Sequence, residues 1–195
     1  MSRKLLLDDI ADLRAYERER PVFREHVIEL KRRRRVSLGT VLTLLFETRD
    51  TIRFQIQEMA RVEKLIRDEQ IQDELDAYNP LIPQGSELTA TFMIEIDDPI
   101  RRARVLDGLG AIENSAFIRV GGETIQGVAE ADQDRKREDG KASSVQFVHF
   151  AFTPAQVAAF KQPGAEVVLG FSHRNYGHMA AMAENIRAEL AGDFD

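Results

Sequence analysis

The chain has 195 residues, of which 43% are hydrophobic and 31% charged, and it contains no cysteine. This balance is typical of a soluble globular protein, and the lack of cysteine excludes disulfide scaffolds, thiolate metal sites and cysteine nucleophiles in this chain. No apolar run approaches the roughly 20 residues that cross a bilayer, and the first residues lack the apolar segment of a secretory signal. We therefore expect a cytoplasmic protein that does not enter the membrane.

The formal net charge of −6 argues against a surface devoted to nucleic acid. The charge is uneven, because residues 1–64 carry 15 Lys and Arg against 11 Asp and Glu, whereas the remainder carries 12 against 22. No linker-like segment separates the two sections. We interpret the asymmetry as a basic section packed against an acidic one.

Residues 1–80 are predicted to be mostly helical with one long strand. Asp8–Glu19 is polar and helix-compatible, and Pro21 suits the first turn of a new helix that ends in the cations Lys31–Arg35. From Val36 to Phe46 the apolar period changes to two, which predicts an extended segment. Gly39 marks either a bulge in this segment or a turn that splits it into a hairpin.

Two further helices are predicted before the sheet begins. Thr48 or Asp50 can cap the first of them. Its apolar face is formed by Ile52, Ile56, Met59 and Ile66. The second covers Asp68–Tyr78 and stops at the following Asn-Pro pair.

Residues 86–173 are predicted to be mostly sheet. Leu88–Ile96 alternates apolar and polar residues, Gly121-Gly122 indicates a hairpin, and Val145–Phe152 is apolar on both faces. Residues 175–191 are assigned to a closing helix. Its apolar stripe is Met179, Ala183, Ile186 and Leu190. The sequence thus predicts a single α+β domain over residues 1–195, with a helical N-terminal third followed by a mainly antiparallel sheet of about five or six strands with short flanking helices.

Several segments resemble a known bacterial family. They are Lys31–Gly39, Phe46–Met59, Tyr78–Pro83, Glu87–Thr91, the Val120–Glu123 hairpin and Ser143–Phe147. Together they are similar to the family catalogued as domain of unknown function 3501, and the Phe46–Met59 block is the most specific. The resemblance covers nearly the whole chain, although His173-Arg174 stands where a His-Pro pair would be expected.

The resemblance implies no established activity. Members of that family tend to be encoded near rubrerythrin-like and iron–sulfur oxidoreductase-like proteins, which implies a role in iron handling or oxidative stress. On this resemblance we expect an accessory or binding protein with a protein partner, and a homodimer is compatible with a domain of this kind.

The first candidate site lies where the predicted long strand leads into a helix. Side chains and free backbone N–H groups converge at such junctions, so they commonly bind ligands. The candidate residues are Glu47, Arg49, Asp50, Gln55, Gln57 and Glu58. Glu47 and Glu58 suit an acid–base pair or metal ligands. The alternative is structural, with Asp50 as a helix cap, Arg49 in an ion pair and the glutamines bound to the backbone.

The second candidate is a metal site formed by His149, His173 and Glu47. If the strands that carry the two histidines pair, their imidazoles could lie on one side of the sheet, and with Glu47 they would suit zinc or non-haem iron. This ligand set supports a metal-dependent enzyme as an alternative function. No metal-ligand spacing in the sequence supports it, and each histidine could equally be a hydrogen-bonded core residue.

The third candidate is the basic run Lys31–Arg35, which contains Arg32, Arg33, Arg34 and Arg35. Consecutive cations can bind nucleic-acid phosphates, which gives a second alternative function. The run straddles a helix end, however, so its side chains should point in different directions, and no aromatic residue lies within it. We favour a salt-bridged helix terminus.

Overall fold

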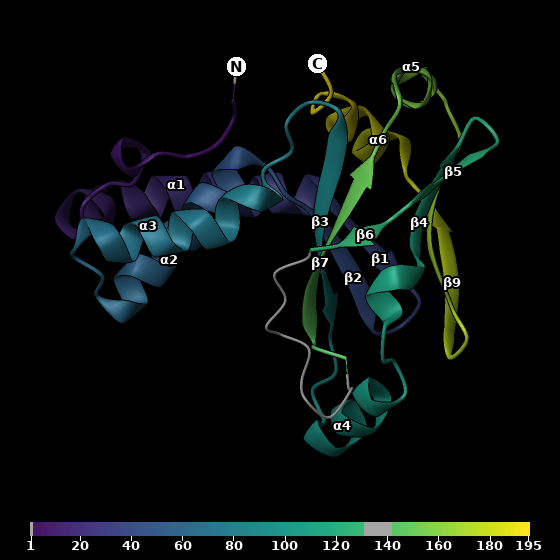
Figure 1. Cartoon of the computed structure of the whole chain (residues 1–195), viewed down its shortest axis with the longest axis horizontal. Helices are drawn as coiled ribbons and strands as arrows, with labels where there is room; N and C mark the ends of the chain where they lie inside the picture. The colour runs from purple at the N-terminus through teal and green to yellow at the C-terminus, as the bar shows by residue number, and fades with distance from the viewer. Residues whose placement is uncertain (1, 131–141) are drawn as a thin grey trace.

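The computed structural model describes residues 2–130 and 142–195, which form two antiparallel sheets and six α-helices. The strand order is β1-β2-β3-β7-β6 in the first sheet and β5-β4-β8-β9 in the second (Figure 1). The α+β class, with helices concentrated at the N-terminal end of the chain, is confirmed. The strands number more than the five or six predicted, and they are divided between two sheets.

The strands are β1 Arg35–Leu38, β2 Leu42–Phe46, β3 Glu87–Ile94, β4 Ala116–Val120, β5 Glu123–Gln126, β6 Val128–Ala129, β7 Val145–Ala151, β8 Val167–His173 and β9 Tyr176–Ala181. The α-helices are α1 Leu13–Arg33, α2 Arg49–Glu63, α3 Asp68–Tyr78, α4 Pro99–Asp107, α5 Pro154–Lys161 and α6 Glu184–Ala191.

The main hydrophobic core lies between the facing surfaces of the two sheets. Alternate residues of β3 and β8 point into it, and Phe92 meets Phe171 edge to face with ring centroids 5.2 Å apart. Alternation along each strand therefore leaves one face of each sheet outside this core. The outer face of the first sheet carries the candidate site described below.

Two short strands that follow each other in the chain, β5 and β6, join the two sheets at one corner. β5 pairs with β4 in the second sheet, and β6 pairs with β7 in the first. Only Gly127 separates β5 from β6, and its N–H still donates to Ala116 O at 2.8 Å. A Cβ atom at Gly127 would lie 2.6 Å from the Val148 side chain, so the close approach of the sheets here requires glycine.

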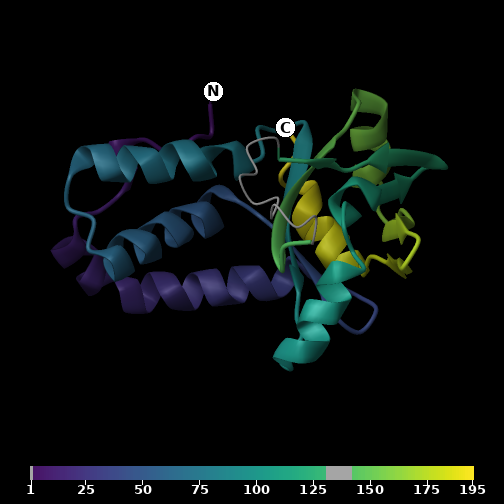
Figure 2. The same cartoon turned by 60° about the horizontal axis from the view of Figure 1, so that its bottom comes forward.

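Helices α1, α2 and α3 lie side by side and extend away from the sheets, with α2 in the middle (Figure 2). A second apolar cluster joins α2 and α3 to the outer face of the first sheet. Its members are Leu5, Ile52, Ile56, Leu75, Leu81 and Ile82, with Phe147 of β7 packed against them. None of the described helices is both long and apolar enough to cross a lipid bilayer.

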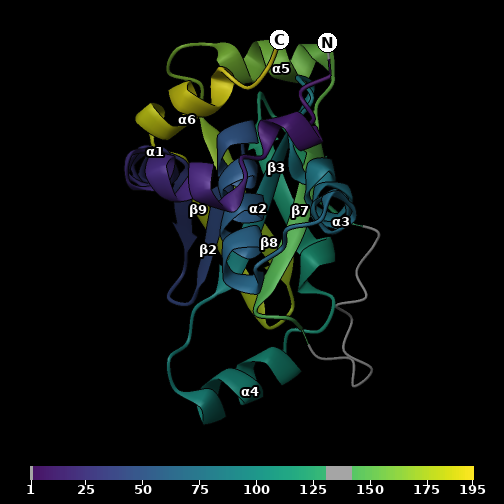
Figure 3. The ribbon, with the colours of Figure 1, turned by 90° about the vertical axis from the view of Figure 1, so that its left-hand side faces the viewer.

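The remaining helices lie at the two ends of the sheets. α5 and α6 cover one end, close to both chain termini, and α4 projects from the other (Figure 3). Arginines of the basic N-terminal section pair with acidic residues on and after α6, as Arg33 does with Glu189 at 3.6 Å and Arg34 with Asp193. The charge asymmetry therefore corresponds in part to internal contacts.

The segment Val36–Phe46 is a hairpin, with Gly39 in its turn at a φ of +64°, so the second of the two interpretations of Gly39 is confirmed. Two other sequence-based boundaries were wrong. α1 runs through Pro21 without starting there, and Pro21 is exposed, so the carbonyl that loses its hydrogen bond can reach water. The closing helix predicted over residues 175–191 begins only at Glu184, because Tyr176–Ala181 pairs with β8 as an edge strand.

Candidate functional site

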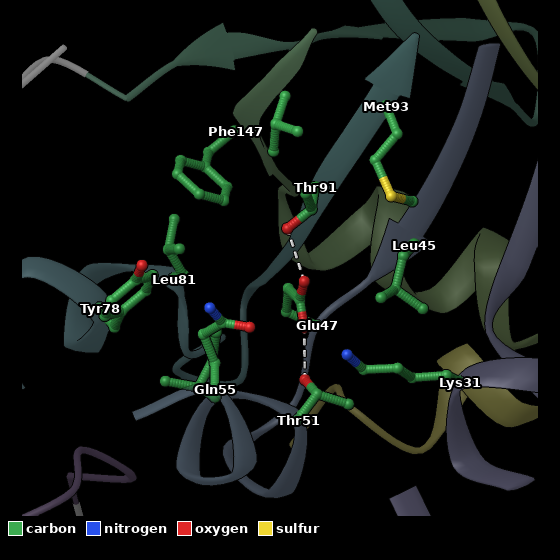
Figure 4. Close-up of a pocket in the computed structure, with 12 residues that line it drawn as sticks. Lys31, Leu45, Glu47, Thr51, Gln55, Tyr78, Leu81, Thr91, Met93 and Phe147 are labelled. Carbon is green, nitrogen blue, oxygen red and sulfur yellow. Dashed lines mark hydrogen bonds between the residues drawn. The ribbon is translucent and has the colours of Figure 1, made fainter. Parts of the chain in front are cut away.

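A cavity of about 230 Å³ lies between the outer face of the first sheet and helices α1, α2 and α3 (Figure 4). Apolar atoms form most of the surface of the cavity, and half of the lining residues carry a polar group. The lining residues are Lys31, Leu45, Glu47, Thr51, Ile52, Gln55, Tyr78, Leu81, Thr91, Met93, Val145 and Phe147. An apolar hollow with a small number of converging polar groups is the usual form of a small-molecule site.

Strand register gathers the sheet side of this cavity from three separate parts of the chain. Leu45 lies opposite Thr91, and Thr91 lies opposite Phe147, so the three side chains form one row across β2, β3 and β7. The side chain of Glu47 follows on the same face, since it is two residues beyond Leu45. Its backbone N–H donates to Thr89 O at 2.9 Å, which extends the ladder past the end of β2.

Glu47 is 7% exposed and accepts a hydrogen bond on each carboxylate oxygen. The Thr91 hydroxyl donates to Oε1 and the Thr51 hydroxyl donates to Oε2, both at 2.5 Å. Thr51 is held in turn because Thr48, the N-cap of α2, forms a reciprocal capping box with it. The two threonines therefore fix the carboxylate, and among the described residues no cation forms an ion pair with it.

Two further polar groups are directed into the same space. Gln55 lies one turn after Thr51 on α2, and its amide turns toward Glu47 (Figure 4). Lys31, in the last turn of α1, extends its ammonium group toward Glu47 and Thr51 in the same view, and it also lies 5.7 Å from the Phe54 ring centroid. Within the part of the chain that the structure describes, neither Gln55 nor Lys31 has a hydrogen-bond or ion-pair partner among other side chains.

Of the predicted junction residues, the structure places Glu47 and Gln55 in this cavity and directs the other four elsewhere. Arg49 pairs with Asp9 at 2.6 Å, and an Asp50 carboxylate oxygen lies 3.1 Å from Nε2 of His26 on α1. Gln57 is fully buried and satisfies the backbone of Ala11, donating to its carbonyl and accepting from its N–H. These contacts agree with the structural alternative for those residues, except that Thr48 and not Asp50 caps the helix.

Glu58 belongs to a separate network between α1 and α2. The Arg20 guanidinium donates to both Glu58 oxygens at 2.7 and 2.9 Å, and the Tyr16 hydroxyl donates to one of them at 2.7 Å. The hydrogen bonds from Arg20, more than any other contact, hold the pKa of Glu58 below its ordinary value. Burial, together with the Glu58 charge, raises the pKa of Tyr16. Glu58 thus joins two helices and does not face Glu47.

The basic run separates into residues with different surroundings. Arg32 is exposed and pairs with Glu29 at 3.0 Å, and Arg35 is exposed on β1. Arg34 is 1% exposed and donates to Phe46 O at 3.0 Å, as well as pairing with Asp193. The run therefore does not form one continuous cationic surface.

The proposed ligands of a metal site are also held apart. His149, on the outer face of the first sheet, lies 2.6 Å from a Glu130 oxygen. His173, at the end of β8 in the second sheet, lies 3.3 Å from Gly110 O. Glu47 is bound to its two threonines. The structure thus does not bring His149, His173 and Glu47 together, and residues 2–130 and 142–195 contain no group of three potential ligand side chains placed to hold a metal ion.

Sequence reasoning missed most of the cavity. Thr91, Tyr78 and Phe147 were not singled out, and Lys31 was assigned to the basic run. The alternation of Glu87–Ile94 placed Thr91 on the polar face of its strand, which was the one available signal. Its contact with Glu47 depends on strand register, which local patterns do not specify.

The family model described as "Protein of unknown function (DUF3501)" matches residues 4–194. The chain belongs to this family. A solved structure from Burkholderia pseudomallei K96243, described as a novel protein of unknown function, is similar to this chain, with 40% sequence identity and a TM-score of 0.91. The match covers 100% of this chain and 100% of that one. No curated protein matches the sequence. The DUF3501 match confirms the resemblance and includes every residue of the cavity, but it supplies no activity.

Proposed function

We propose that this DUF3501 protein is a binding protein that holds a small organic molecule in the cavity around Glu47. The observation that carries the proposal is the Glu47 carboxylate itself, which is buried at the cavity wall and fixed by two hydroxyl groups without a cationic partner among the described residues. Burying a charged group is costly unless other groups compensate it. A ligand with a hydrogen-bond donor or a positive charge would provide that compensation.

The rest of the cavity supports a small and partly apolar ligand. Leu81 and Phe147 line one side, and Leu45 and Met93 line the other (Figure 4). The volume of about 230 Å³ is below the usual range for drug-sized ligands, so it suits a molecule with on the order of ten non-hydrogen atoms.

The family resemblance extends this proposal to a cellular role. On that resemblance alone, we propose that the protein acts in the cytoplasm as an accessory factor for an iron or oxidative-stress system, through a protein partner. Reciprocal co-purification from the native organism tests this part. Recovery of an oxidoreductase in both directions is the expected result, and failure in both directions would refute the accessory role without affecting the cavity.

The binding proposal is tested by screening a library of small fragments against the protein with two-dimensional NMR. We expect fragments that shift the amide signals of the cavity residues Leu81 and Phe147. Glu47→Gln keeps the size of the side chain but removes its charge, and it should weaken those fragments at least about tenfold.

A matched control is Glu95→Gln. Glu95 also accepts a threonine hydroxyl, from Thr43 at 2.6 Å, but it is exposed and does not line the cavity. This variant should bind the same fragments as the unmodified protein. If no fragment reaches the cavity, or if Glu47→Gln binds as well as Glu95→Gln, the proposed function is wrong.

A further inference from the structure

The cavity contains two opposite charges that the protein does not use to neutralise each other. The Glu47 carboxylate is bound by two hydroxyls, and the Lys31 ammonium approaches it from α1 without forming an ion pair with any described carboxylate (Figure 4). In the described part of the chain, the Lys31 ammonium group makes one cation–π contact, with the Phe54 ring, whose centroid lies 5.7 Å from the nitrogen. Both charges therefore remain available to a molecule inside the cavity.

A ligand with a single charge would satisfy only half of this arrangement. An amine would compensate Glu47 but would bring a second positive charge close to Lys31, and a carboxylate would have the opposite defect. A ligand with an ammonium group and a carboxylate on neighbouring atoms would place each next to its complement. Charge-assisted hydrogen bonds of this kind are about twice as strong as neutral ones.

The apolar walls determine what the rest of the ligand must be. Leu81 and Phe147 lie on the side of the cavity away from Lys31 (Figure 4). The neutral amide of Gln55, which has no partner among the described side chains, can donate to a carboxylate or accept from an ammonium group. A branched or aromatic hydrocarbon group would therefore pack against the apolar side while the charged end meets Glu47, Lys31 and Gln55.

We infer that the ligand is a zwitterion with an apolar substituent, of the size and chemistry of a free apolar α-amino acid. Its ammonium group binds Glu47, its carboxylate binds Lys31, and its side chain packs on Leu81 and Phe147. This inference rests on the proposed function, because it names the ligand class of the same cavity.

The test compares three probes that differ only in their charged groups. L-leucine carries both charges, 3-methylbutylamine lacks the carboxylate, and 4-methylpentanoate lacks the ammonium group. Isothermal titration calorimetry of the full chain should give the tightest binding for L-leucine, with each of the other two at least about tenfold weaker.

Two variants connect each charge of the probe to one residue. Glu47→Gln should weaken L-leucine, because the partner of its ammonium group is lost, and should strengthen 4-methylpentanoate, because the repulsion between its carboxylate and Glu47 is removed, so that the two probes bind with similar affinity. Lys31→Met keeps the aliphatic stem and should reduce L-leucine to the affinity of 3-methylbutylamine. Arg32→Met, which removes an exposed neighbouring cation, is the control and should change none of the three affinities.

The outcomes separate this inference from the proposed function. If 3-methylbutylamine binds as tightly as L-leucine, the cavity binds amines and the zwitterion is refuted while the binding function stands. If none of the three probes binds but fragments still reach the cavity by NMR, the inference is refuted alone. If neither probes nor fragments bind, both are refuted.

Discussion

Replacement of the buried Arg34 tests the contacts that hold the C-terminal end of β2, which leads into Glu47, in place. Its guanidinium is 1% exposed, donates to Phe46 O at 3.0 Å and to Glu47 O at 3.4 Å, and pairs with Asp193 and Glu189. Arg34→Met keeps the aliphatic stem but leaves Asp193 without its strongest partner and leaves both carbonyls without a donor. Removing one member of a buried ion pair typically costs about 3–5 kcal/mol of unfolding free energy.

For a chain of this length, that cost corresponds to a fall in melting temperature of roughly 6–20 °C. Arg32→Met is the matched control from the same basic run, because Arg32 is exposed and its i,i+3 pair with Glu29 contributes only about 0.2–0.5 kcal/mol. Circular dichroism melts of both variants measure the difference. Equal melting temperatures would refute the view that Arg34 is an internal structural residue.

The loss should also depend on pH. Burial raises the pKa of Asp193 above its ordinary value, and the charge of Arg34 opposes this rise. Without Arg34 the pKa in the folded state rises further, so the folded protein binds this proton more tightly than the unfolded chain does. Stability is then retained at low pH and lost as the pH rises through the raised pKa.

Arg34→Met should therefore be less destabilising at about pH 4.5 than at about pH 7. The double variant Arg34→Met/Asp193→Asn should recover part of the loss at about pH 7, because it removes the unpaired charge. A loss that is the same at both pH values, with no recovery in the double variant, would contradict this reasoning.

Two further predictions concern the sheet corner and the helix pair. Gly127→Ala should lower the unfolding free energy by about 1–3 kcal/mol, since its Cβ would meet Val148 at 2.6 Å, whereas Gly177→Ala, with no atom closer than 3.9 Å, should be nearly neutral in chemical denaturation. Arg20 favours the charged form of Glu58 and so lowers its pKa in the folded protein. The resulting stabilisation of the fold is complete above the ordinary pKa of 4.5 and is lost as the pH falls through the lowered pKa of the folded state, and Glu58→Gln should remove it. The melting temperatures of Glu58→Gln and of the unmodified protein should become equal in acid. A difference in melting temperature that is the same at all pH values would contradict the role given to the Arg20–Glu58 pair.

The sequence predicted the elements whose burial follows a regular period. The alternation in Leu88–Ile96 and the turn at Gly121-Gly122 correspond to β3 and to the β4–β5 hairpin. β9 was missed because most of its residues are exposed, so no alternation marks it, and Met179 happens to continue the helical spacing of α6. An edge strand of this kind is defined by its partner β8, which a local pattern does not contain.

The candidate site was predicted in part for a similar reason. Glu47 and Gln55 were found because they belong to one continuous strand-to-helix junction. Thr91 and Phe147 come from strands that are distant in the sequence, and they reach Glu47 only through the register of β2, β3 and β7. Arg49 and Asp50 looked equivalent to Glu47 in the sequence, but the rotation of the first helical turn directs them away from the cavity.

The continuity of β5 and β6 through Gly127 has a consequence for how the protein opens. The two sheets share this strand, so they cannot separate without breaking ladder hydrogen bonds in both. We expect the amides of β4 and β7 to exchange with solvent hydrogen only in the global unfolding event, as one cooperative unit. Helices α2 and α3 are held to the sheet by a separate apolar cluster, and α1 packs against α2, so the amides of these helices can exchange through a smaller opening. A ligand between the helices and the sheet would slow exchange in the helices while leaving the sandwich unchanged.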